Sequence, residues 1–266
     1  MSALAVALTA APAAADHSRE QRITDDTAYT LSADQWRLGL WKADYGVLDP
    51  LMIGSHWWVW WFRLANAHVK WRWYFDDPWA FALNLQALYL DTRDLGFLDE
   101  NLGTGRLWVV TQEAAASYYA SERTTFSAGL GYTNVTMVGE INVEAFDGTA
   151  AAAVDNLQLW ATGEYRVSRV TALVIHARYL VFQHLTGRGL VRYEPDQYTT
   201  VEIHGGGRKR ALDFPHAWSV VPSVVLSWKT FNLRAGLGYG NWNVPLLNFV
   251  RRERTLIPDL DAYFVF

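Results

Sequence analysis

The last seven residues of the chain alternate between apolar and polar side chains. Leu260, Ala262, Phe264 and Phe266 share one face of an extended strand, whereas Asp259, Asp261 and Tyr263 share the other. A soluble protein rarely ends on an unprotected aromatic strand, because a free apolar edge invites aggregation. The ending therefore indicates a strand whose apolar face is protected in its native environment.

The same period of two recurs along most of the chain. In residues 171–181, for example, Leu173, Ile175 and Tyr179 oppose His176 and Arg178. Many of the apolar faces begin or end in an aromatic residue and carry aliphatic residues between, as a hydrocarbon band with aromatic flanks requires. The pattern predicts strands at roughly residues 27–33, 35–45, 51–62, 67–75, 79–91, 105–119, 123–137, 155–166, 169–183, 214–228, 231–242 and 258–266, which is about twelve, with 10–14 possible.

Short and long connections alternate between these strands. Tight turns are expected at Asp49-Pro50, Asp76-Asp77-Pro78, Ser121-Glu122, Val167-Ser168 and Lys229-Thr230. Long connections are expected at about residues 92–104, 139–153, 184–213 and 243–257, and residues 198–204 could form a hairpin arm within one of them. Transmembrane barrels alternate in this way between tight periplasmic turns and longer outer loops.

The composition excludes several other classes of protein. The chain has no cysteine, which removes disulfides and zinc–thiolate sites, and no apolar run of about 18 residues follows the N-terminus, which removes a helical membrane protein. The 14 tryptophans and a mean hydropathy of −0.04 are typical of strands that alternate between lipid and a polar interior. A net charge of −4 gives no indication of nucleic-acid binding.

The N-terminal residues divide into two predicted segments ahead of a barrel at residues 27–266. Residues 1–15 are apolar and end in Ala13-Ala14-Ala15, a small-residue pattern that predicts a secretory signal, although its usual positive start is missing. Residues 16–26 are then expected to be a short periplasmic segment.

Together these features resemble the bacterial outer-membrane β-barrels, and Phe264 and Phe266 resemble the terminal signal that barrel-assembly machinery reads. The resemblance implies an all-β, closed antiparallel transmembrane barrel, porin-like and monomeric, in a Gram-negative outer membrane. It implies contact with outer-membrane lipid and lipopolysaccharide and with the assembly machinery as partners. It covers about residues 27–266 in pattern and includes no specific family motif.

The inward faces of such a barrel would carry a set of charged and histidine side chains of both signs. They could form a salt-bridged plug, which we favour, or line a path for small polar or anionic solutes, with His68, Lys70 and Arg72 as candidates on one strand. The candidate lumen-lining residues are His56, His68, Lys70, Arg72, Glu113, Glu164, Arg166, His176, Arg178, Arg234, Asp259 and Asp261.

Two other functions remain open, a barrel enzyme acting on lipid or peptide and a soluble periplasmic barrel or sandwich that binds an apolar ligand. The His-x-Ser-Asn-Gly element of the outer-membrane phospholipase is missing, and Ser55 lies on the opposite strand face from His56. Asp76-Asp77 resembles the acidic pairs of omptin proteases, but its place beside Pro78 predicts turn chemistry instead. Histidine spacing indicates no metal site, and no cofactor is expected.

Three positions, Pro222, Gln112 and Lys42, fit the pattern less well, and Gln112 falls on the nominally outward face of its strand. Pro222 interrupts an otherwise regular strand, so we expect a bulge there. Lys42 falls on the outward face of its predicted strand, near the strand end, where its amine could snorkel toward water. Residues 205–210, Gly-Gly-Gly-Arg-Lys-Arg, are expected in an outer loop.

Overall fold

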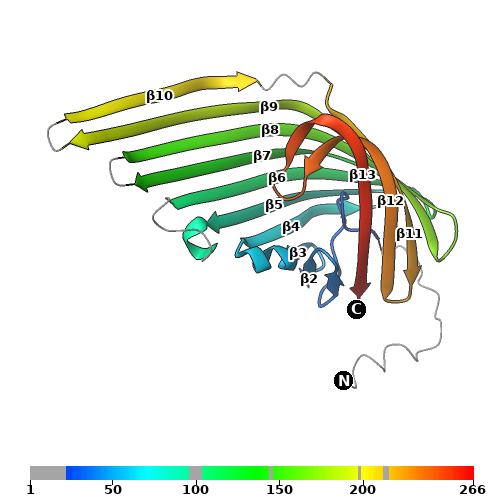
Figure 1. Ribbon diagram of the computed structural model, residues 1–266. Coiled ribbons are helices and arrows are strands. Elements are labelled where there is room, and N and C mark those ends of the chain that lie inside the picture. The colour runs from blue at the N-terminus through cyan, green and yellow to red at the C-terminus, as the bar shows by residue number, and fades with distance from the viewer. Residues whose placement is uncertain (1–21, 96–103, 144–145, 197–198, 212–215) are drawn as a thin grey trace.

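A computed structural model describes residues 22–95, 104–143, 146–196, 199–211 and 216–266 of the chain. Thirteen antiparallel strands form one sheet, and twelve of them close into a barrel (Figure 1). Closure comes from β9, which pairs with β8 along one edge and with β11 along the other. The remaining strand, β10, pairs with the outer half of β9, beyond the part that β11 covers.

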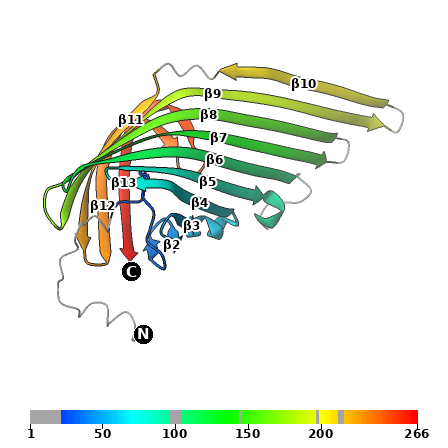
Figure 2. The same ribbon diagram turned by 180° about the vertical axis from the view of Figure 1, so that it is seen from behind.

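The twelve barrel strands differ greatly in length. Three neighbouring strands are the shortest, β1 (Trp36–Gly39), β2 (Ala43–Leu48) and β3 (Leu51–Ser55), and a 3-10 helix, η1 (Trp57–Phe62), follows them. The others are β4 (Ala65–Asp76), β5 (Trp79–Asp91), β6 (Thr104–Ser121), β7 (Thr124–Val143), β8 (Phe146–Arg166), β9 (Thr171–Asp196), β11 (Trp218–Trp228), β12 (Phe231–Val244) and β13 (Phe249–Val265), with β10 at Thr199–Ala211 and a short 3-10 helix, η2, at Thr92–Leu95. Figure 2 shows from behind how β6 to β10 extend well beyond the short strands.

The predicted number of strands is confirmed, although the first strands are placed differently. Residues 27–33 form no strand, and the single strand predicted over 35–45 is instead the hairpin of β1 and β2. One predicted strand is absent and another is two strands, so the total is still twelve. The tight turn at residues 40–42 was hidden in the sequence because it contains no glycine or proline.

The short turns define one end of the barrel, which we call the terminal end. The turns after β2, β4, β6, β8 and β11 lie where they were predicted, at the end that also holds Phe266. The opposite end, the loop end, contains more strand than was predicted. Residues 146–153 and 184–196 continue β8 and β9, and residues 205–210 belong to β10 and not to a loop.

Apolar side chains face outward and polar side chains face inward in the barrel wall. Leu159, Leu173 and Ile175 are exposed, as the alternation predicted, whereas Thr162, His176 and other polar neighbours are buried inside. In the described part of the chain, no helix is long and apolar enough to cross a membrane.

The expected bulge at Pro222 is wrong. Pairing of β11 with β12 keeps the same register on both sides of Val221 and Pro222. Gly236, which stands opposite Ser223, makes this possible, because an added Cβ there would lie 2.4 Å from the carbonyl oxygen of Pro222. Close approach of the two backbones thus replaces a bulge.

Candidate functional site

Residues 22–35 lie inside the barrel, and we call them the N-terminal insert. Ile23 packs against Ala172, Val174 and Val225 of β9 and β11, whereas Ala28 and Tyr29 pack against Ala80 and Ala82 of β5. The backbone N–H of Ala28 also donates to Ser117 Oγ of β6 at 2.7 Å. The insert therefore contacts opposite walls of the barrel and occupies the space between them.

Charged groups hold the tip of the insert in the lumen. Asp25 lies 2.6 Å from both Arg37 Nη2 and Lys42 Nζ, and Asp26 lies 3.2 Å from Arg178 Nη2. The ammonium of Lys70 donates to the carbonyl oxygen of Thr24 at 2.6 Å. Four wall bases thus bind three consecutive residues of the insert.

The environment keeps Asp25 and Asp26, the two carboxylates of the insert that face the basic wall, ionised. Burial alone would raise the pKa of Asp25, but the charges of Arg37 and Lys42 outweigh it and hold that pKa well below its usual range. Burial also opposes ionisation of Asp26, whereas His176, Arg178 and Arg234 lower its pKa to about 2. At neutral pH the insert therefore presents two negative charges to the basic wall.

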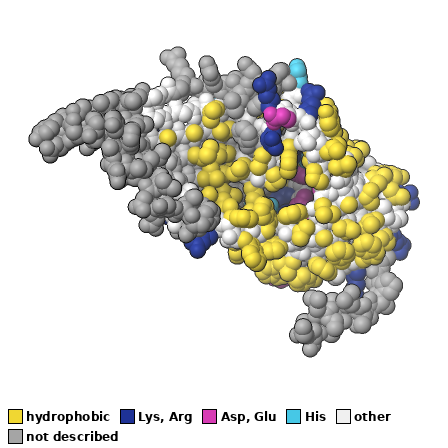
Figure 3. Space-filling model, viewed as in Figure 1, with side chains coloured by type: hydrophobic (Ala, Val, Ile, Leu, Met, Phe, Trp, Pro, Cys, Tyr) yellow, Lys and Arg dark blue, Asp and Glu magenta, His cyan; other side chains and the backbone are white. Residues whose placement is uncertain are grey.

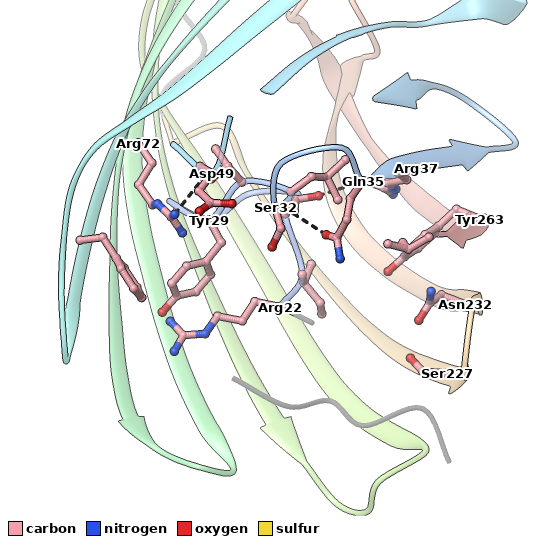
Figure 4. Close-up of a pocket in the computed structure, with 16 residues that line it drawn as sticks. Arg22, Tyr29, Ser32, Gln35, Arg37, Asp49, Arg72, Ser227, Asn232 and Tyr263 are labelled. Carbon is pink, nitrogen blue, oxygen red and sulfur yellow. Dashed lines mark hydrogen bonds between the residues drawn. The ribbon is translucent and has the colours of Figure 1, made fainter. Parts of the chain in front are cut away.

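A cavity of about 360 Å³ lies at the terminal end, between the insert and the wall (Figure 4). The guanidinium of Arg22 lies over the ring of Tyr29 at 4.3 Å and over that of Tyr119 at 4.6 Å. Arg72 lines the same side, over the ring of Phe75 at 4.5 Å, and donates to the carbonyl oxygen of Asp49 at 3.0 Å. The cavity is thus largely polar, and the insert forms much of its boundary.

A second segment, residues 245–250, joins β12 to β13 and includes the first two residues of β13; it folds against the inside of the wall toward the loop end, and we call it the hairpin insert. Leu246 and Leu247 pack against an inward cluster of Leu88, Val109, Val135 and Val154. The side-chain amide of Asn248 donates to Thr111 Oγ1 at 3.0 Å. This part of the chain was predicted to be an outer loop, but its apolar and amide side chains bind it to the inside of the wall.

The structure places the twelve candidate lumen residues on the inner side of the wall or at its rim. On β4, His68 Nε2 lies 2.9 Å from Asp44 Oδ1, and Lys70 and Arg72 make the carbonyl contacts described above. His56 lies at the start of η1, with its ring centre 5.9 Å from that of His68. Burial of the His56 imidazole, which lies outside the strands, lowers its pKa to about 4.

The other candidates form small pairs, either two residues apart on one strand or across neighbouring strands. Glu113 accepts a hydrogen bond from Asn84 at 2.8 Å, and Arg166 Nε donates to Glu164 at 3.0 Å. Arg178 donates to His176 Nε2 at 2.7 Å. Arg234 lies 2.5 Å from Asp259, and Asp261 accepts from Arg37 at 2.7 Å.

Most of the wall bases have partners that sequence reasoning missed. Arg234 pairs with Asp259, which is another of the twelve candidates. Lys70 and Arg72 instead donate to the backbone carbonyl oxygens of Thr24 and Asp49, respectively. Arg178 pairs with the carboxylate of Asp26. Lys42 was expected on the outer face, yet it points inward, because the turn between β1 and β2 resets the alternation. The missed residues are Thr24, Asp25, Asp26, Arg37, Lys42 and Asp44.

Ser55 and Asp76-Asp77, the two sequence features considered for catalysis, both lie at structural positions. Ser55 Oγ donates to the carbonyl oxygen of Asn66 at 2.9 Å, and Asp76-Asp77 lies at the turn between β4 and β5. No group of three or more histidine and acidic side chains in this part of the chain could hold a metal ion.

The terminal strand closes the barrel at the predicted place. The backbone of Phe266 exchanges two hydrogen bonds with Trp36, at 2.8 and 3.0 Å. The side chains of Phe264 and Phe266 are both exposed on the outer face. They are therefore accessible in the folded barrel, and their role as an assembly signal remains a prediction.

No protein-family model and no curated protein match the chain. Among solved structures, the Pseudomonas putida toluene transporter TodX is 11% identical, with 90% of this chain and 68% of that chain covered and a TM-score of 0.48. The Ralstonia pickettii toluene transporter TbuX is 11% identical over 89% and 72%, with a TM-score of 0.46. The translocator domain of autotransporter NalP from Neisseria meningitidis is 10% identical over 87% and 83%, with a TM-score of 0.46. At this level of similarity the matches carry no argument about function.

Proposed function

We propose that this protein is an outer-membrane β-barrel that acts as a gated passive channel for small polar solutes, with a preference for anions. We infer that the N-terminal insert is its gate and that the channel is closed while the insert lies in the lumen. The observation that carries the proposal is the way this insert is held, by ion pairs and hydrogen bonds to a polar wall.

The distribution of side chains supports the membrane location. A soluble barrel buries apolar side chains inside and shows polar ones to water, whereas this barrel has the opposite arrangement. Exposed aromatic residues such as Trp79, Tyr118 and Trp228 lie in strand rows next to the terminal-end turns, and Trp108 and Tyr239 lie toward the loop end. Aliphatic residues such as Leu83 and Leu173 lie between them, which is the order that a bilayer favours.

The contacts of the insert support gating over a purely structural plug. Asp25 and Asp26 are partly exposed, and the insert borders a polar cavity at the terminal end. These polar contacts can be exchanged for water at modest net cost, and release of the insert also exposes the apolar contacts of Ile23, Ala28 and Tyr29. The insert can therefore leave the lumen while the strands of the barrel stay paired.

The charges of the wall support a preference for anions in the open state. Arg37, Lys42 and Arg178 all lose a carboxylate partner when the insert leaves, and Lys70 loses a carbonyl partner. A lumen with an excess of basic groups attracts anions and repels cations.

Conductance of the purified chain in planar bilayers tests the proposal. The parent protein should give rare openings, whereas removal of residues 22–30 should give frequent, anion-selective openings without loss of heat-modifiable migration in gels. Cation-selective or absent currents in a folded deletion variant would contradict the proposed gate. Large, stable currents from the parent would contradict the closed state.

The proposal includes the partners that the location implies. We infer a monomer that contacts outer-membrane lipid and lipopolysaccharide and is inserted by barrel-assembly machinery. No arrangement of the described side chains favours the enzyme alternative over the channel.

A further inference from the structure

The barrel wall has an opening on the loop-end side of its three shortest strands, β1, β2 and β3, and we call this opening the notch. β1 has four residues, whereas its neighbour β13 has 17, which at about 3.3 Å per residue corresponds to roughly 13 and 56 Å. β1 pairs with β13 only at residues 263–265. From Ala262 toward the loop end, no strand in the described part of the chain pairs with the edge of β13 that faces β1. Figure 3 shows a hollow in the apolar face beside β13, with acidic side chains visible inside it.

The notch has an aromatic side and a strand edge. On the aromatic side, Trp57 Nε1 donates to the carbonyl oxygen of Gly39 at 2.9 Å, which holds η1 above the β1–β2 hairpin. From η1, Trp60 and Trp61 are exposed by 57% and 81%. On the strand edge, Leu256 and Leu260 of β13 are also exposed. The notch thus opens between two apolar surfaces.

The sequence of β13 protects its free edge against pairing with another strand. Pro258 removes one backbone donor, and Arg251, Arg252 and Glu253 stand opposite Trp242 alone, because Arg254 pairs with Asn241 and Val250 with Asn243. Proline, charged side chains and bulges are the devices that proteins use to keep an edge strand unpaired. We therefore expect the edge of β13 at the notch to stay unpaired in the folded barrel and not to pair with a strand from another chain.

The bulge concentrates positive charge at the outer part of this edge. The side-chain amide of Asn241 donates to the carbonyl oxygens of Arg251 and Arg252, at 3.2 and 2.8 Å, and so fixes the bulge. The side chains of Arg251, Arg252 and Arg254 are exposed, and the single acid among them, Glu253, lies 3.8 Å from Arg251. Arginine binds phosphate oxygens in a bidentate way, which makes an exposed arginine cluster complementary to a phosphate headgroup.

We propose that the notch is a binding site for an anionic phospholipid of the surrounding bilayer. Its phosphate binds Arg251 and Arg252, while Arg254, whose guanidinium lies over the ring of Trp218 on β11 at 5.4 Å, adds positive charge nearby. Its acyl chains lie in the notch against Leu256, Leu260 and the tryptophans of η1. The lipid covers the apolar sides of the opening that the short strands leave. The proposal goes beyond the channel function and shares with it the location in a membrane.

Native mass spectrometry of the purified full chain tests the site. The protein in neutral detergent is offered equal amounts of phosphatidylglycerol and phosphatidylcholine with the same acyl chains. We expect retention of phosphatidylglycerol in preference to phosphatidylcholine, and a preference that falls as salt is raised. Equal retention of the two lipids, or a preference that salt leaves unchanged, would overturn the proposal.

Variants locate the binding. Changing Arg251, Arg252 and Arg254 together to glutamine should weaken retention of phosphatidylglycerol by about tenfold or more. A matched variant with Arg123, Arg169 and Lys229 changed to glutamine removes the same charge from the turns at the terminal end and should retain the lipid. Trp61→Gln should weaken retention of both lipids.

The controls separate this site from the channel. Heat-modifiable migration establishes that each variant is folded. An equal loss in the two triple variants would show that net charge, and not the notch, selects the lipid. Conductance of the parent and of the insert deletion does not depend on these arginines, so the two proposals can fail independently.

Discussion

Neutralising Asp25 and Asp26, the two acids of the N-terminal insert that pair with wall bases, should release the insert from the lumen. The perturbation is the double change Asp25→Asn and Asp26→Asn, which keeps the size of both side chains and removes their charge. Asp25 contacts Arg37 and Lys42 at 2.6 Å, and Asp26 contacts Arg178 at 3.2 Å. Each change therefore weakens charge-assisted hydrogen bonds in a mostly buried place.

The magnitude follows from the partners that remain. A hydrogen bond to a charged group contributes about 1.5–3 kcal/mol. Arg37 keeps Asp261 at 2.7 Å, so we take a value near the low end, about 2 kcal/mol for each acid. One such loss shifts the equilibrium between bound and released insert about 30-fold, and two independent losses shift it about a thousandfold.

A single cysteine measures this shift, because the chain contains none of its own. Thr27 is buried in the insert, so Thr27→Cys should react slowly with a bulky maleimide when the insert is bound. In the Asp25→Asn, Asp26→Asn background its labelling rate should rise by at least about 30-fold. A control with Glu122→Gln and Glu253→Gln makes the same change in charge at exposed sites and should leave the rate unchanged. An unchanged rate in a folded double variant would refute the idea that ion pairs hold the insert.

Three further results are expected. Leu159→Arg places a charge on the outer face of β8 and should cost about 2–4 kcal/mol of unfolding free energy in bilayers, measured by urea titration, whereas a cost near zero would mean that this face does not contact lipid. Deletion of Phe266 removes both hydrogen bonds to Trp36 and should lower the heat-modifiable fraction in the outer membrane, and full recovery there would contradict a role in assembly. Because the pKa of Asp26 is lowered from 3.8 to about 2, its ion pair contributes fully above pH 4 and is lost as the pH falls toward 2, so channel openings should increase across that window and Asp26→Asn should remove this component.

The sequence determined that the strands of this protein are apolar on one face and polar on the other. Side chains in a strand point to alternate faces, so the apolar positions of Leu159, Leu173 and Ile175 and the polar positions of His176 and Arg178 could be read directly. The tight turns carried proline, aspartate or serine at the predicted places. These signals are local, and they were sufficient for an antiparallel barrel of about twelve strands.

The tertiary structure decided what fills the lumen. Asp25 meets Lys42 and Asp261 meets Arg37 because barrel closure brings the first and last strands together around the insert. Nothing in the local pattern of residues 22–35 or 245–250 tells an inward segment from a loop in water, since both lack regular alternation. The turn at residues 40–42 also reversed the expected face of the residues that follow Trp41, including Lys42.

The physical reason for this division is the range of the interactions. Alternation and turn chemistry act between residues close in sequence, so the sequence by itself gives the strands, their faces and the ends at which they turn. The ion pairs of the insert and the notch above β1 depend on closure and on the unequal lengths of neighbouring strands. Those are properties of the whole sheet, and only the folded barrel sets them.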